Sequence, residues 1–403
     1  MKRPIGVLTR PRGFLAAGSA AGIRGTPGVP DVALLVCETP ASGAAVFTTN
    51  RLCAAPVQVS REHLERSRGR VKAVVVNSGN ANACTGLRGT RDAGRMAALT
   101  AGLLDVEPAR VLVASTGIIG RTLPMGRVES GIRRAARELS AERRGARRFT
   151  QAIMTTDRFP KEAETSLVLA GKRVRLAGAA KGAGMIAPHL ATMLAFVTTD
   201  AAVSPALLRK LLVQAADDSF NRITVDGHMS TNDTCILLAS GRSGAAVRSG
   251  SRWERKFARA LREVTLELAL EIVRDGEGAV RLVTLQVEHA GSERDAELAA
   301  RAVAGSPLVK TALFGADPNW GRIVSAAGAS GCAFREDRTS LRVNGLWMYR
   351  RGRPLPPSRA VERAMTGSRL TFVLDLGLGR GSSVVYTCDL GYAYVRLNAE
   401  YHT

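Results

Sequence analysis

One threonine stands in a setting in which it could become a nucleophile. Thr192 follows Ala191 within the apolar stretch 190–194. In most proteins such a threonine lies in a buried strand and bonds locally. At a new chain terminus, however, threonine has its own α-amine as a base, and the usual pKa of that amine, about 7.7 to 8.0, leaves a neutral fraction near pH 7. Cleavage between Ala191 and Thr192 would therefore create the catalyst.

Small polar residues gather in four segments beside expected strand ends. They are 77–82, 115–117, 181–185 together with 191–192, and 230–234. Such residues expose the backbone to ligands, although clusters of Asn, Gly and Ser more often form turns. Each segment, taken separately, is weak support for a site.

The elements that would position these segments alternate between β-rich runs and amphipathic helices, which predicts an α/β fold. Strands are expected at 71–76 and 111–115, with a helix between them that begins near Thr90. Ser204 followed by Pro205 predicts the start of another helix, and a long helix is expected over 252–274.

A Gly-rich segment near the end of the chain lies between two expected strands. The segment is 377–381, and the strands are 370–374 and 383–387. A phosphate-binding loop would have to enter a helix, whereas β-branched residues follow here. We therefore expect a hairpin turn.

The chain is strongly basic. It has 403 residues, with 57 Lys and Arg against 35 Asp and Glu, and a formal net charge of +22. Such a charge suits nucleic acid, a membrane surface or small anionic substrates. Only 4% of the residues are aromatic, so the stacking platforms of single-strand binders are scarce. We expect a solvated basic surface and no nucleic-acid partner.

The cysteines and histidines indicate neither a metal site nor a disulfide framework. The 6 cysteines have no C-x-x-C spacing, and the 5 histidines form no H-E-x-x-H pattern. The longest uncharged stretch, 182–199, contains Pro188 and is a poor membrane span. We expect a cytoplasmic protein with no metal, no bound cofactor and no membrane contact.

Several long motifs together resemble the ornithine acetyltransferase (glutamate N-acetyltransferase) family over nearly the whole chain. The most specific is KGAGMIAPHLATML at 181–194, which looks like the self-cleavage segment of that family. The others are 13–18, 45–50, 77–82, 306–312, 317–322 and 394–403. So many motifs in the same order are not expected by chance.

The resemblance implies a ping-pong acetyltransferase of arginine biosynthesis. Thr192 would take the acetyl group of N2-acetylornithine as an ester, release ornithine and pass the acetyl group to glutamate. Thr116 and Gly117 match the oxyanion pair of the family, and one such donor is worth roughly 3 to 4 kcal/mol in comparable sites. The motifs leave open whether acetyl-CoA also serves as a co-substrate.

The resemblance also carries over a set of substrate-binding positions. A lysine and hydroxyl groups suit an amino-acid carboxylate, and a carboxylate suits the ammonium group. The matching residues are Thr155, Lys181, Thr192, Glu277, Asn398 and Thr403. Arg158 and His228 depart from the family pattern, in which threonine is common at the first position and an acidic residue at the second.

The fold implied by the resemblance is α/β, with layered sheets and helices of the ornithine acetyltransferase and DmpA-like type. One assembly would form from an alpha fragment, residues 1–191, and a beta fragment, residues 192–403, as a heterotetramer of two of each. Two alternatives stay open. One is a self-processing amidohydrolase or aminopeptidase of related fold, in which water takes the acyl group. The other is a basic nucleic-acid-binding protein that has lost catalysis.

Overall fold

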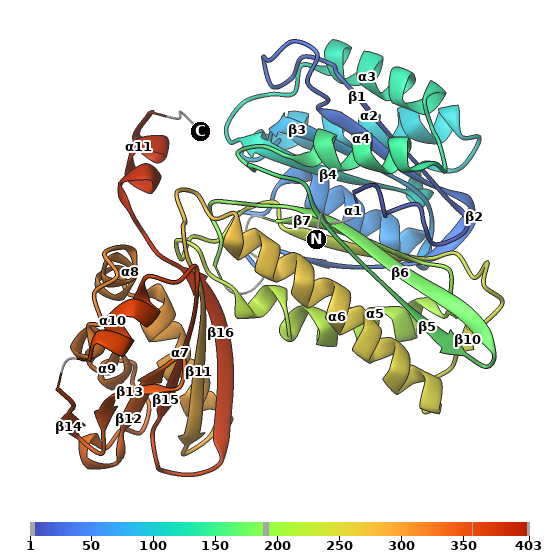
Figure 1. The fold of residues 1–403 in the computed structure, drawn as a ribbon. Helices are drawn as coiled ribbons and strands as arrows, with labels where there is room; N and C mark the ends of the chain where they lie inside the picture. The colour runs from blue at the N-terminus through green and yellow to red at the C-terminus, as the bar shows by residue number, and fades with distance from the viewer. Residues whose placement is uncertain (1–4, 188–192, 357, 401–403) are drawn as a thin grey trace.

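The chain folds into two lobes, and the C-terminal helix lies above the smaller lobe and beside the larger one (Figure 1). The computed structural model describes residues 5–187, 193–356 and 358–400. The larger lobe contains the residues before about 280, and the smaller lobe is built from residues 282–388. None of the helices in the described ranges is long and apolar enough to cross a membrane.

The larger lobe is built on one eight-stranded sheet. Its strand order is β4–β3–β2–β9–β7–β6–β5, and β1 pairs with β2. The strands are β1 (Phe14–Ser19), β2 (Val32–Phe47), β3 (Arg70–Asn80), β4 (Val111–Ile118), β5 (Lys161–Leu169), β6 (Lys172–Lys181), β7 (Leu194–Thr199) and β9 (Thr234–Ala239). The strands expected at 71–76 and 111–115 are confirmed as parts of β3 and β4.

The long strand β2 folds this sheet into two layers. Its first half pairs with β3 and its second half with β9, and the pairing register with β3 shifts between Val36 and Ala41. Such an irregularity bends a strand and increases its twist. The facing sides of the two half-sheets then enclose one apolar core, in which Phe149 and Phe196 meet edge to face at 5.1 Å.

Helices cover both outer faces of the folded sheet. On the half with β3 and β4 they are α1 (Ala55–Arg66), α2 (Gly86–Leu103) and α3 (Met125–Arg137), and on the half with β7 and β9 they are α5 (Pro205–Asp217) and α6 (Arg252–Arg274). Helix α4 (Arg143–Ile153) packs into the core between the halves. The helix start at Ser204 is confirmed, because its hydroxyl accepts a hydrogen bond from the Leu207 amide. A short sheet joins β8 (Ala202–Val203) and β10 (Ala246–Val247).

The smaller lobe packs helices on one face of a six-stranded sheet. Its strand order is β14–β13–β12–β15–β11–β16. The strands are β11 (Leu282–Ala290), β12 (Ser340–Val343), β13 (Leu346–Arg350), β14 (Arg353–Pro354), β15 (Arg369–Asp375) and β16 (Gly381–Cys388). The helices are α7 (Glu293–Gly305), α8 (Pro307–Phe314), α9 (Trp320–Gly328) and α10 (Arg359–Met365). After β16, helix α11 (Tyr392–Glu400) ends the described chain.

The hairpin expected at 377–381 is wrong. Strands β15 and β16 are not neighbours, because β11 lies between them and pairs with both. The Gly-rich segment instead wraps around the end of β11, where the amides of Leu378 and Gly379 donate to the carbonyl oxygen of His289. A Cβ on Gly379 would lie 2.6 Å from the Ala290 carbonyl oxygen, so close backbone approach explains the glycine.

The two lobes divide at a different place from the expected fragments. The lobes separate near residue 280, whereas the bond between residues 191 and 192 falls between β6 and β7. These two strands are hydrogen-bonded neighbours, with Lys181 opposite Leu194. A cut there would leave both fragments within one sheet.

Candidate active site

The four polar segments meet at one end of the folded sheet. Their described residues lie at the C-terminal ends of β3, β4 and β6 and at the start of β9. The Ser115 hydroxyl donates to the Asn77 side chain at 2.6 Å. The side-chain Nδ2 of Asn232 donates to the carbonyl oxygens of Ala81 at 2.6 Å and Ser115 at 2.8 Å. These buried hydrogen bonds fix three of the segments, 77–82, 115–117 and 230–234, to one another. The segments expected to expose backbone to ligands therefore lie together.

Thr116 and Gly117 lie where β4 ends. The Thr116 hydroxyl accepts a hydrogen bond from the Lys181 ammonium group at 3.3 Å. Gly117 has a φ of 131°, and a Cβ there would lie 2.3 Å from the carbonyl carbon of Gly79. Only glycine fits this conformation and this contact. The expected oxyanion pair therefore lies beside the expected substrate lysine.

Lys181 is a buried cation at the end of β6. Its side chain is 3% exposed. Burial lowers the pKa of the ammonium group below its usual value, although the nearby Asp157 and Glu277 carboxylates act in the opposite direction. A buried ammonium group can bind an incoming carboxylate through a charge-assisted hydrogen bond.

A buried ionic network of Lys161, Asp157 and Asp275 lies next to Lys181. The Lys161 ammonium group bonds the carboxylates of Asp157 at 2.5 Å and Asp275 at 2.6 Å, and all three side chains are fully buried. Burial alone would raise the pKa of Asp157, but Lys161 and Lys181 outweigh it and hold that pKa below its usual range. Asp157 also accepts the backbone amides of Thr155 at 2.9 Å and Gly182 at 2.8 Å.

Asp157 thus connects Thr155, an expected substrate position, with Gly182, which directly follows the expected substrate lysine, Lys181. The family resemblance assigned no role to Asp157. The feature of the sequence that could have indicated Asp157 is its position directly after the two threonines at 155 and 156.

Glu277, in the loop after α6, and Asn398, on α11, are joined by a hydrogen bond. The Asn398 amide nitrogen donates to a Glu277 carboxylate oxygen at 2.9 Å, although the two residues lie 121 positions apart. The Glu277 amide also donates to the Ala183 carbonyl oxygen at 2.8 Å. A Cβ on Gly184 would lie 2.4 Å from a Glu277 carboxylate oxygen, so the glycine leaves room for the Glu277 side chain in its present position. Two expected substrate residues are therefore brought together beside Lys181.

Two carboxylates hold the ends of the segment that contains the expected cleavage site. Asp226 accepts the amides of Met185 at 2.6 Å and Ile186 at 2.8 Å, and Asp233 accepts the amide of Met193 at 2.8 Å. Ala191, Thr192 and Thr403 lie outside the described residues. The expectations for these three residues remain predictions.

Comparisons with known proteins match nearly the whole chain to one family. The ArgJ family model matches residues 15–403. The chain is 49% identical over 401 residues to the arginine biosynthesis bifunctional protein ArgJ of Symbiobacterium thermophilum, covering 99% of both chains. It is 46% identical over 396 residues to the protein of the same name from Chlorobaculum tepidum, covering 98% of this chain and 96% of that one.

This chain belongs to the ArgJ family. The family predicted from the motifs is confirmed, and with it the layered α/β fold and the interpretation as an acetyltransferase rather than an amidohydrolase. Among solved structures, the ArgJ protein of Bacillus halodurans is 41% identical and aligns with a TM-score of 0.43, covering 46% of this chain and 93% of that one.

The two departures from the family pattern have different surroundings in this ArgJ chain. The Arg158 guanidinium bonds the Asp275 carboxylate at 2.9 Å and the Arg274 carbonyl oxygen at 3.1 Å, so it extends the buried network toward the surface. His228 is exposed, and its amide donates to Asp226.

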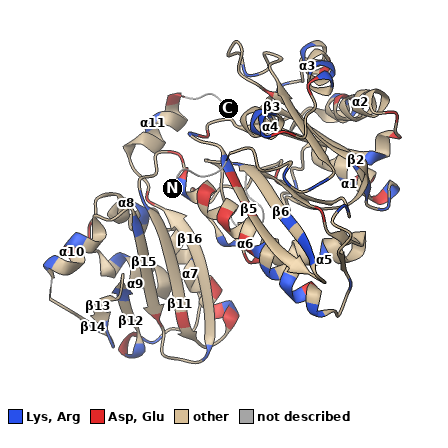
Figure 2. Ribbon diagram, turned by 45° about the vertical axis from the view of Figure 1, so that its right-hand side comes forward, with Lys and Arg blue, Asp and Glu red and all other residues tan. Residues whose placement is uncertain are grey.

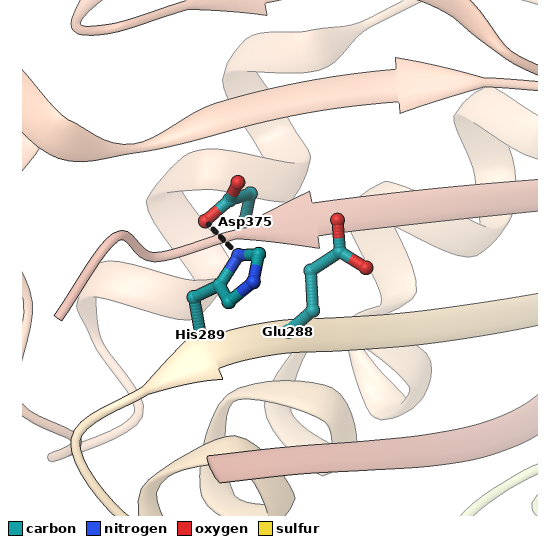
Figure 3. Close-up of side chains that lie close together, drawn as sticks. All are labelled: Glu288, His289 and Asp375. Carbon is teal, nitrogen blue, oxygen red and sulfur yellow. Dashed lines mark ion pairs between the residues drawn. The ribbon is translucent and has the colours of Figure 1, made fainter. Parts of the chain in front are cut away.

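A second group of ionisable side chains lies in the smaller lobe, away from the ArgJ site (Figure 3). Glu288, His289 and Asp375 bring their ligand atoms within 4.8 Å of one another. The His289 ring lies 3.1 Å from the Asp375 carboxylate, and Arg342 bonds Glu288 at 2.9 Å. Both carboxylates therefore have partners, and the histidine side chain is 57% exposed. These contacts describe a surface ion-pair cluster.

The basic residues are spread over both lobes (Figure 2). Several pair locally with acids, such as Arg148 with Glu138 at 2.5 Å and Lys210 with Glu254 at 2.9 Å. This distribution agrees with the expected solvated basic surface.

Proposed function

We propose that this chain moves the acetyl group of N2-acetylornithine to glutamate through an acetyl ester on Thr192, after cutting itself between Ala191 and Thr192. The observation that carries the proposal is the contact of the buried Lys181 ammonium group with the Thr116 hydroxyl at 3.3 Å. This contact joins a carboxylate-binding cation to the oxyanion pair. An acyl-transfer site for amino acids needs both groups within the length of one substrate.

Each remaining residue has a role set by its charge. Lys181, with the hydroxyls of Thr155 and Thr403, would bind the α-carboxylate of acetylornithine or glutamate. Glu277, held by Asn398, would bind the ammonium group of the ornithine side chain. Thr116 and Gly117 would donate to the oxygen that becomes negative in each tetrahedral intermediate.

Acetyl-CoA is proposed as a second acetyl donor, with no resident cofactor or metal. Support comes from the relatives, which are named bifunctional proteins of arginine biosynthesis. An assay with acetyl-CoA and glutamate but without acetylornithine tests this part. Release of free CoA together with acetylglutamate is expected, and its absence in an enzyme active with acetylornithine would limit the chain to acetyl recycling.

The two fragments are proposed to remain together in the cytoplasm as a heterotetramer of two alpha fragments, 1–191, and two beta fragments, 192–403. Support comes from the pairing of β6 with β7, which joins residues on either side of the cut. Light scattering under native conditions should give the mass of four fragments, and a mass of one fragment pair would contradict the tetramer.

Variants of Thr192 test the nucleophile. Denaturing electrophoresis and mass measurement of the purified wild-type chain should show two fragments, one beginning at Thr192. Thr192→Ala should remain a single chain without transferase activity, whereas Thr192→Ser keeps a hydroxyl and should retain both reactions at reduced rates. An intact wild-type chain with full activity would contradict the mechanism.

A further inference from the structure

The buried carboxylate of Asp275 links the loop that contains Glu277 to another part of the chain. Asp275 directly follows α6, is 1% exposed and lies two residues before Glu277. Its Oδ2 accepts the Lys161 ammonium group at 2.6 Å and the Arg158 backbone amide at 3.0 Å. Its Oδ1 accepts the Arg158 guanidinium at 2.9 Å. Three donors therefore fix this one carboxylate.

The Lys161 ammonium group continues this connection to the end of β6. It also bonds Oδ1 of Asp157 at 2.5 Å, and the same oxygen accepts the Gly182 amide at 2.8 Å. Gly182 directly follows Lys181. A continuous series of hydrogen bonds therefore runs from the backbone beside Lys181 to the carboxylate beside the Glu277 loop.

A direct contact between the two segments closes the series into a ring. The Glu277 amide donates to the carbonyl oxygen of Ala183, two residues after Lys181, at 2.8 Å. The segments that contain Lys181 and Glu277 are thus joined twice, once through this backbone bond and once through the buried carboxylates and their shared ammonium group. Two separate connections hold a pair of side chains at a more nearly constant distance than one connection does.

Burial makes the ionic part of the ring resistant to displacement. The side chains of Lys161, Asp157 and Asp275 are all 0% exposed. Buried ions have lost their hydration, so separating them costs more than separating an exposed pair. The Glu277 loop is therefore held against the outward movement that a longer substrate would require.

We propose that Asp275 is a positioning residue that holds Glu277 at a fixed distance from Lys181, so that the site prefers the chain length of ornithine. This inference rests on the proposed function, in which Lys181 binds the α-carboxylate and Glu277 binds the side-chain ammonium group. Lysine has one more methylene group between these two charges than ornithine has. In a site of fixed length, the lysine derivative makes one of the two ionic contacts poorly.

Asp275→Asn weakens the connection with little change in side-chain shape. The new amide nitrogen accepts no hydrogen bond, whereas Lys161 keeps Asp157 as its partner, so the variant should fold. Acetyl transfer to glutamate is measured with N2-acetylornithine and with N2-acetyllysine as donors. The wild-type ratio of the two kcat/KM values should be roughly 10 to 200, the effect of one methylene group, and in the variant it should fall at least about fivefold.

This ratio separates positioning from loss of fold. A smaller fraction of folded enzyme lowers both kcat/KM values by the same factor and leaves their ratio unchanged. The fall in the ratio should come mainly from a higher KM for acetylornithine. An unchanged ratio in Asp275→Asn, or a wild type that does not discriminate between the donors, would overturn the proposal.

The matched control is Asp200→Asn, at the end of β7 remote from Lys181. Asp200 is also 1% exposed, accepts the Arg175 amide at 2.9 Å and lies 3.8 Å from the guanidinium of the exposed Arg12. It is therefore a buried carboxylate with a backbone donor and an arginine, as Asp275 is. Its ratio should equal that of the wild type, and a fall as large as in Asp275→Asn would show that the effect is not specific to this site.

Arg158→Thr tests whether the buried part of the ring sets the distance. The Arg158 side chain is 52% exposed, and its removal leaves the bond between Lys161 and Asp275 intact. The ratio should therefore fall less than in Asp275→Asn. A fall of equal or larger size would place the control of distance at the surface arginine and overturn the assignment to Asp275.

Calorimetry distinguishes failure of this inference from failure of the proposed function. Ornithine and lysine are titrated into the wild type and into Asp275→Asn. The wild type should bind ornithine at least about tenfold more tightly than lysine, and the variant should lose most of this preference. Preferential binding of ornithine by a wild type that transfers no acetyl group contradicts the proposed function alone. Acetyl transfer with an unchanged ratio in Asp275→Asn contradicts only the role of Asp275.

Discussion

Two clusters of ionisable residues, one in each lobe, show how burial changes what the same groups do. In the larger lobe, Lys161 and its two carboxylate partners are fully buried. In the smaller lobe, the His289 and Asp375 side chains are 57% and 29% exposed. Both clusters contain cations beside acids at hydrogen-bond distance. The buried cluster lies beside Lys181 and Thr155, two of the expected substrate positions.

The physical difference is solvation. Water screens exposed charges, so a surface ion pair contributes little to stability and leaves each group close to its ordinary behaviour. A buried charge has lost its hydration and depends on its partner. Removing one member should therefore have large consequences in the larger lobe and small ones in the smaller lobe.

The largest expected effect is on stability, from Lys161→Met. The variant leaves Asp157 and Asp275 buried without their shared cation, at an expected cost of about 3 to 5 kcal/mol. Denaturant unfolding followed by circular dichroism measures the free energy of unfolding. Arg342→Met, which removes the partner of Glu288, should cost at most about 1 kcal/mol. Equal losses in the two variants would remove the distinction between the clusters.

The next effect is on catalysis, from Lys181→Met. Hydrogen bonds to charged groups contribute about 1.5 to 3 kcal/mol, so kcat/KM for acetylornithine should fall roughly 10- to 100-fold. Lys172→Met is the control, since Lys172 lies at the exposed start of the same strand and bonds the Gly244 carbonyl oxygen at 2.9 Å. An unchanged kcat/KM in Lys181→Met would remove this residue from the substrate site.

Acidification should act through Asp157. The folded pKa of Asp157 is lower than the unfolded pKa of about 3.9, so the native state binds fewer protons than the unfolded state as the pH falls. The stability contributed by Asp157 is fully present above the unfolded pKa and is lost as the pH drops toward the folded pKa. Below about pH 4 the melting temperature of the wild type should fall more steeply than that of Asp157→Asn. Parallel curves would show that another group governs acid unfolding.

A smaller effect is expected from Asn398→Ala. The variant removes the hydrogen bond to Glu277, which lies partly exposed, and an ordinary hydrogen bond contributes about 0.5 to 1.5 kcal/mol. KM for acetylornithine should rise roughly two- to tenfold while the melting temperature stays unchanged. A loss of stability without a change in KM would indicate that α11 serves the fold rather than the substrate.

The smallest effect is expected in the surface cluster. His289→Gln should change the free energy of unfolding by no more than about 0.5 kcal/mol, because the His289–Asp375 pair is largely solvated. Activity should be unaffected. Thermal stabilisation of the wild type by added Zn²⁺, absent in the variant, would contradict the description as a plain ion-pair cluster.

Local chemistry explains which parts of the fold the sequence predicted. The capping serine at 204 acts on the amide three residues later, and the long helix at 252–274 is defined by its own apolar spacing. The family motifs likewise gave Thr116, Lys181, Glu277 and Asn398 their expected roles from residue order alone, and those roles remain predictions. The prediction of a hairpin at 377–381 failed because β11, about 90 residues earlier in the chain, lies between β15 and β16. The residues near 377–381 contain no information about so distant a strand.

The sequence by itself determined the family, the polar segments and the residue types available for acyl transfer. Only the tertiary structure decided that Lys181 contacts Thr116 and that Asp157 joins Lys161 in a buried network. The reason is that hydration and charge pairing depend on what surrounds a group in space. A carboxyl group has the same covalent structure in both lobes, and its burial determines its proton affinity.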